Sequence, residues 1–161
     1  MNFQVTNSEL SEIKSDLEII IVVKKKLDHA FVVDKKSLKK AGFEGKQDEL
    51  CLLVESSKLY VGSDSLKGSD IRPAIATAIR SLIGNKAYKS IKIGTYLSHP
   101  RCTATLRAMI EGIGLGAYTF TRYKSTKIKS AIKKVTISLE GYNKHEASIE
   151  SASRAVHNGE I

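Results

Sequence analysis

The segment 17–23 constrains the fold of this chain more than any other, because its last five residues are all β-branched. A strand with one face in water alternates apolar and polar residues, whereas a strand covered on both faces reads as a nearly continuous apolar run. Three lysines, Lys24 to Lys26, end the run. The sequence therefore predicts an interior strand at 17–23, in a sheet with further layers on both of its faces.

Five other parts of the chain have the pattern of strands. Phe3 and Val5 flank a polar residue with strand-like alternation. The apolar run 50–54 and the segment 58–61 are separated by a short polar stretch, which favours a β-hairpin. Alternating residues predict two later strands, at 90–94 and at 135–139.

Helical spacing of apolar residues is clearest over 70–83. Ser69 or Asp70 is expected to cap this helix, and Pro73 is expected to lie in its first turn. Gly84 is expected to end it. Three further helices are predicted, at 35–41, 101–118 and 146–161.

Strands and helices alternate along the chain, and the central strands are predicted to be covered on both faces. This pattern predicts an α/β fold with three α/β/α layers and a mixed central sheet. A length of 161 residues fits one domain with a substantial core.

The net charge of +9 is unevenly distributed. Residues 1–85 carry 13 basic and 12 acidic side chains, whereas residues 86–161 carry 13 basic and 5 acidic ones. Such a basic surface attracts polyanions or an acidic partner. No apolar run approaches the roughly 20 residues of a membrane span, and no signal peptide is recognisable, so a cytoplasmic protein is expected.

The cysteines and histidines of this sequence do not have the spacing of a catalytic or metal-binding site. Cys51 and Cys102 are far apart and lack metal-ligand spacing, so free thiols in a reducing compartment are expected. The histidines are scattered, without a second ligand at helix-face spacing; they are His29, His99, His145 and His157. No catalytic or metal-binding residue is therefore predicted in this chain.

The segment 111–125, EGIGLGAYTFTRYKS, carries the most specific signal. Its glycines do not make a dinucleotide loop, because a helix is predicted before them and a loop after them. Small residues that allow close helix packing are the better interpretation. A helix that ends at Gly-Ala-Tyr, followed by an aromatic residue and an Arg-Tyr-Lys-Ser run, resembles the amino-terminal domain of leucyl aminopeptidases. Thr121 departs from the pattern, since the family often has Asp there.

The resemblance extends over the whole chain and implies several properties. It implies a macro-domain-like fold, with residues 1–141 as the amino-terminal domain and 142–161 as the start of a linker helix toward a catalytic domain. It implies a parent metallo-aminopeptidase, a homohexamer that uses two Mn²⁺ or Zn²⁺ ions per subunit. The family's Asn-Thr-Asp-Ala-Glu-Gly-Arg type of signature is missing here. The implied role of this part is assembly and control of access to the active sites, and peptide substrates would be bound only by the absent domain.

A basic segment with aromatic residues just before it is the candidate contact site. Cations and aromatic rings together can hold phosphates and stack bases. The alternatives left open are nucleic-acid binding, a contact with another subunit, and a solvated connection; a free-standing module that binds nucleic acid or ADP-ribose is the alternative function. The candidate residues are Arg122, Lys124, Lys127, Lys129, Lys133 and Lys134.

Overall fold

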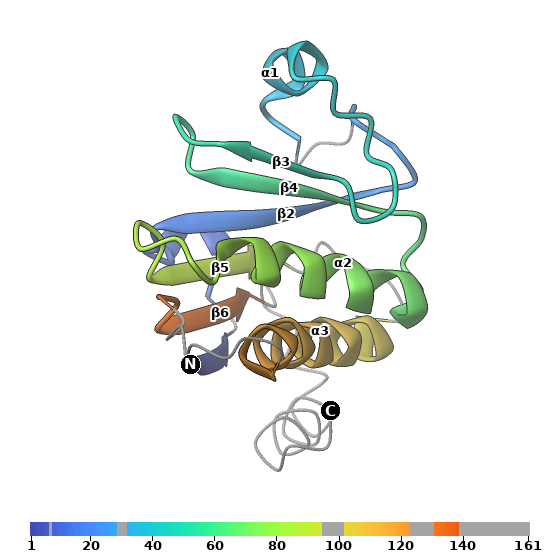
Figure 1. Cartoon of the computed structure of the whole chain (residues 1–161). Helices are drawn as coiled ribbons and strands as arrows, with labels where there is room; N and C mark the ends of the chain where they lie inside the picture. Colours follow the sequence, from blue (N-terminus) through green and yellow to red (C-terminus); the bar gives the residue numbers. More distant parts are fainter. Residues whose placement is uncertain (7, 29–31, 95–101, 123–130, 139–161) are drawn as a thin grey trace.

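The computed structural model describes residues 1–6, 8–28, 32–94, 102–122 and 131–138, with backbone only at 102–104 and 119–122. They form a six-stranded mixed sheet in the order β1-β6-β5-β2-β4-β3 (Figure 1). Every neighbouring pair of strands is parallel except β3 and β4. The strands are β1 (Asn2–Thr6), β2 (Leu17–Val23), β3 (Leu50–Leu53), β4 (Lys58–Ser63), β5 (Ser90–Gly94) and β6 (Lys134–Ser138).

The strand β2 lies in the middle of the sheet, as its apolar run predicts. Successive side chains of a strand point to opposite faces. Ile19 and Ile21 join a large cluster under the helices α2 (Gly68–Leu82) and α3 (Cys102–Arg122). Ile20 and Val22 join a smaller cluster with the short helix α1 (Lys35–Lys40). The predicted α/β fold, with a mixed sheet between helices, is confirmed.

Two glycines of α3 bring it against α2. A Cβ at Gly112 would lie 2.7 Å from the carbonyl oxygen of Arg72, and one at Gly116 would lie 2.6 Å from that of Ala76. Such distances are far inside van der Waals contact with backbone atoms, so any side chain would push the helices apart. The expectation that these small residues serve helix packing is confirmed.

The ends of both helices differ from the prediction. The helix α2 begins before Ser69 and Asp70, so neither is its cap, and Pro73 lies in its interior. The Ser65 hydroxyl instead accepts the Lys67 amide (3.0 Å) and donates to the Asp70 carboxylate, which ties down the entry to the helix. The helix α3 continues to Arg122 rather than stopping near 118. Its glycines do not end it, because their contacts with α2 offset the conformational cost of glycine in a helix.

The face opposite α2 and α3 carries thinner cover. A single turn of 3-10 helix, η1 (Leu10–Glu12), lies beside β5, where Lys92 Nζ donates to the carbonyl oxygens of Leu10 (3.0 Å) and Ile13 (3.2 Å). Beside β4, the loop 44–49 approaches so closely that a Cβ at Gly62 would lie 1.9 Å from the Lys46 carbonyl oxygen.

The loop 44–49 is held by one carboxylate. Glu49 Oε1 accepts the backbone amides of Glu44 (2.9 Å), Gly45 (2.8 Å) and Lys46 (3.1 Å). Partial burial raises the pKa of Glu49, but these three amides outweigh it and the net shift is downward. The carboxylate is thus used structurally.

Some predicted features are not tested here. The turn at 98–100, the last residue of the strand at 135–139 and the helix at 146–161 lie outside the described residues. Among the helices that are described, none is long and apolar enough to cross a membrane.

Candidate interaction surface

Two of the six predicted contact residues are described in full. Lys133 and Lys134 are exposed where β6 begins, and Lys134 pairs with Asn2 on one side and with Ser90 on the other. Arg122 is the last residue of α3, so it is helical rather than part of a loop. The remaining three, Lys124, Lys127 and Lys129, lie outside the described residues.

The fold adds two lysines that the sequence prediction did not include. Lys86 and Lys89 are exposed on the connection between α2 and β5. The backbone joins this connection to the start of β6, because the Lys133 and Lys134 amides donate to the Lys89 carbonyl at 2.7 and 3.2 Å. We call the set Lys86, Lys89, Lys133 and Lys134 the lysine edge.

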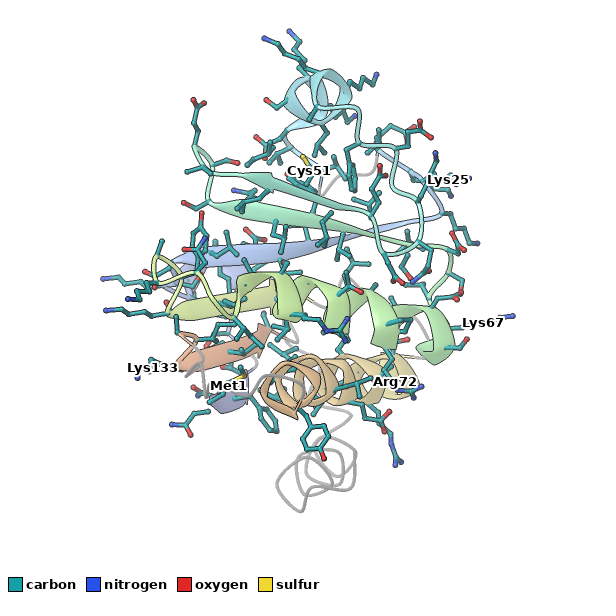
Figure 2. All side chains as sticks on the ribbon, viewed as in Figure 1. Met1, Lys25, Cys51, Lys67, Arg72 and Lys133 are labelled. Carbon is teal, nitrogen blue, oxygen red and sulfur yellow. The ribbon has the colours of Figure 1, made fainter. Side chains whose placement is uncertain are left out.

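The lysine edge lies at the amino-terminal end of the parallel strands. Figure 2 shows Lys133 at this end with Met1, whereas Lys25 and Lys67 are at the opposite end of the sheet. Asp16 lies nearby, and its carboxylate accepts the Lys89 and Ser90 amides at 2.9 and 3.1 Å. These two backbone hydrogen bonds lower the pKa of Asp16. Asp16 therefore orders the backbone that carries Lys89.

Glu111, which is the single acidic residue in 86–134, is engaged elsewhere. It accepts Arg72 Nε (2.7 Å) from α2 and Arg107 Nε (2.9 Å) from its own helix. Burial raises the pKa of Glu111, but the two arginines outweigh it, so the net shift is downward. The pairing joins α2 to α3 and leaves the lysine edge without this carboxylate.

The described residues contain no group of three or more His, Cys, Asp or Glu side chains that could hold a metal ion. The Cys51 thiol has its pKa raised, first by burial and then by Glu49, which disfavours a reactive thiolate. All four histidines lie outside the described part of the chain.

Comparison with solved structures identifies the fold of this domain. The tomato leucine aminopeptidase K354E mutant superposes with a TM-score of 0.71 over 98% of this chain and 36% of its own, at 15% identity. The bottromycin maturation enzyme BotP superposes with a TM-score of 0.63 over 89% of this chain and 31% of its own, at 17% identity. These likenesses show a shared α/β fold.

The family follows from the sequence comparisons. Residues 23–127 match the N-terminal domain of the cytosol aminopeptidase family. A probable cytosol aminopeptidase of Wolinella succinogenes is 34% identical over 134 residues, which are 83% of this chain and 27% of that protein. One from Campylobacter jejuni is 31% identical over 162 residues, covering 100% of this chain and 32% of the relative. This chain belongs to the cytosol aminopeptidase family, as an amino-terminal domain, and spans about a third or less of these relatives.

Proposed function

We propose that this chain is the non-catalytic part of a cytoplasmic metallo-aminopeptidase, in which it supports assembly of a homohexamer and restricts access to the active sites. In this proposal the parent protein releases amino-terminal residues from peptides with two Mn²⁺ or Zn²⁺ ions, which would activate water and polarise the peptide carbonyl. The observation that carries the proposal is the family match over 23–127, in relatives of which this chain covers 27% and 32%.

The described residues support a division of labour between this domain and the rest of the protein. No cluster among them fits a two-metal centre, so the ions of the parent would be held elsewhere. The lysine edge is a cluster of exposed basic side chains, which suits contact with an acidic protein surface. The division into a domain at 1–141 and a linker helix starting at 142 is part of the same proposal.

The test compares this chain with the longest protein encoded by its reading frame. Each is purified and assayed for hydrolysis of leucine amide with Mn²⁺ or Zn²⁺ added. The chain alone should show no activity above the blank, and a longer protein should be active. Robust metal-dependent hydrolysis by the purified 161-residue chain would contradict the proposal.

The alternative is a free-standing module that binds nucleic acid or ADP-ribose. The lysine edge is the observation in its favour, because clustered lysines neutralise phosphates and release counterions. The comparisons give this alternative no support. Affinity for nucleic acid that falls steeply with salt would favour it.

A further inference from the structure

A hollow in the surface lies between the turn that follows β2 and the end of α1. Its volume is about 450 Å³, within the range of about 300–1,000 Å³ that is usual for small-molecule sites. Two lysines and a glutamate supply the charged part of its lining, and Leu27 and Phe43 supply the apolar part. Phe43 is only 4% exposed and belongs to the smaller apolar cluster, so packing holds this part of the lining in place.

The two lysines of the hollow come from different elements. Lys25 lies in the turn after β2, and Lys39 lies in the last turn of α1. Neither forms an ion pair with any residue that the structure describes. Glu44 supplies the carboxylate of the lining, and its Oε2 atom lies 3.2 Å from Lys46 Nζ, which offsets its charge. The balance of charge at the hollow is therefore positive.

The backbone that carries Lys25 is strained. Lys24 and Lys25 have φ angles of 56° and 59°, in the left-handed region that is uncommon for residues other than glycine and asparagine. The Lys26 amide closes this turn by donating to the Val23 carbonyl at 3.2 Å. Turns with two left-handed central residues usually carry Asn or Gly, so the conformational preference of lysine does not explain its presence here. Strain of this kind is concentrated at functional sites, including those that bind ligands.

The hollow also has the position that ligands take in open α/β sheets, beyond the carboxyl ends of the strands where the strand order reverses. The strand β2 lies between its parallel neighbours β4 and β5. The chain passes from β2 to β4 on one side and then through α2 to β5 on the other, so the order reverses at β2. Lys25 follows the carboxyl end of β2, beside the loop after α1, where a Cβ at Gly45 would lie 3.2 Å from Lys25 Cα (Figure 2).

We propose that this hollow binds a small organic anion, namely a carboxylate that carries an apolar group. Lys25 and Lys39 would contact the carboxylate, and Leu27 and Phe43 would contact the apolar group. An anion fits better than a cation because Glu44 already pairs with Lys46, whereas the two lysines have no acidic partner among the described residues.

Binding can be measured by titrating isocaproate into this chain, isotopically labelled for NMR, at constant ionic strength. The backbone amide signals of Lys25, Leu27, Gly42 and Phe43 should shift and then saturate, because these residues line the hollow. Formate is the comparison ligand, since it has the same charge and no apolar group. We expect isocaproate to bind about tenfold more tightly, because burial of its apolar surface adds to the affinity.

Matched charge variants separate a site from the general attraction of anions to a basic protein. Lys25→Gln combined with Lys39→Gln removes both proposed contacts, and we expect the affinity for isocaproate to fall by about fivefold or more. Lys26→Gln combined with Lys40→Gln is the control, because these neighbours are exposed and lie outside the lining. The control removes the same charge and should change the affinity by less than about twofold, since salt screens distant charges.

Three results would overturn the proposal. The first is the absence of a saturable shift at the four amides. The second is equal affinity for isocaproate and formate, which would show that the apolar lining is not used. The third is an equal loss of affinity in the two double variants, with amide spectra showing that both are folded. The aminopeptidase assignment is independent of these results, because the hydrolysis assay decides it.

Discussion

Among the described residues, the face of the sheet under α2 and α3 buries 23 clustered apolar side chains, whereas the face under α1 buries six. The large cluster joins two long helices, whose backbones approach through Gly112 and Gly116. The small cluster depends more on polar contacts. Tyr60 lies in it and donates from its hydroxyl to the Asp34 carboxylate at 2.7 Å.

This difference indicates how stability is distributed in the domain. Apolar burial contributes roughly in proportion to area, so the α2 and α3 side should unfold only with the whole domain. The α1 side, with one turn and a half of helix and a loop tied by Glu49, should open locally at lower free energy.

The largest effect is expected from adding side-chain atoms where the two long helices are in close contact. The double substitution of Gly112→Ala and Gly116→Ala introduces Cβ atoms within 2.7 Å of backbone oxygens. Overpacking of this kind typically costs about 1–3 kcal/mol per site, and the better helix propensity of alanine recovers only part of it. We expect the free energy of unfolding, measured with urea, to fall by about 2–4 kcal/mol.

Gly84→Ala is the matched control for this double variant. A Cβ at Gly84 meets nothing within 4 Å, so the same chemical change should alter stability by no more than about 0.5 kcal/mol. If the double variant were as stable as the control, the close approach of α2 and α3 would not be what holds this face.

A smaller and local effect is expected on the α1 side. In Gly62→Ala the new methyl group would lie 1.9 Å from the Lys46 carbonyl oxygen, so the loop 44–49 must move. Because the loop can move without separating α2 from α3, we expect a loss of about 1–3 kcal/mol. Amide hydrogen exchange should speed up in α1 and β3 and stay unchanged in the centre of α2.

Uniform acceleration of exchange in Gly62→Ala would contradict this division of the molecule. It would mean that the two faces unfold together and that the smaller cluster contributes to the same cooperative unit. Unchanged exchange in α1 would show that the loop does not support that helix.

The sheet could be predicted from the sequence because a strand that is buried on both faces has a nearly continuous apolar sequence. The run 17–23 became β2 with the same bounds, and the hairpin of β3 and β4 followed from two apolar runs around a polar break. Helix ends were harder, because tertiary contacts outweigh local preferences. The helix predicted at 101–118 was expected to end at the Gly-Ala-Tyr step, yet α3 continues to Arg122, and Gly116 lies inside it where it contacts Ala76.

The contact surface was predicted only in part, for a similar reason. Lys133 and Lys134 were identified within a basic run, but Lys86 and Lys89 lie more than 40 residues earlier in the sequence. The parallel strands β5 and β6 start at the same end of the sheet, which brings the two connections together. The sequence does show an excess of basic residues over 86–134. The predicted contact site included only the basic residues from Arg122 to Lys134, so it left out Lys86 and Lys89.

The smallest effect concerns the ion pairs that join α2 to α3. Glu111→Gln removes the charge that Arg72 and Arg107 contact, and these arginine side chains are 41% and 60% exposed. Because solvent screens such pairs, we expect a loss of about 1 kcal/mol or less at neutral pH. The folded-state pKa of Glu111 is lowered from 4.5. A lowered pKa stabilises the folded state above the unfolded-state value and loses that contribution as pH falls through the folded-state value.

The difference in unfolding free energy between the parent chain and Glu111→Gln should therefore shrink as pH falls below 4.5. Urea titrations at a series of pH values measure it directly. Glu44→Gln is the matched control, since Glu44 pairs with Lys46 at 3.2 Å on the surface, with side chains 62% and 60% exposed. The difference in unfolding free energy between the parent chain and Glu44→Gln should be small at every pH. A pH-independent loss in Glu111→Gln would instead show that this residue matters through its shape and its hydrogen bonds, and that its charge adds nothing to the stronger of the two faces.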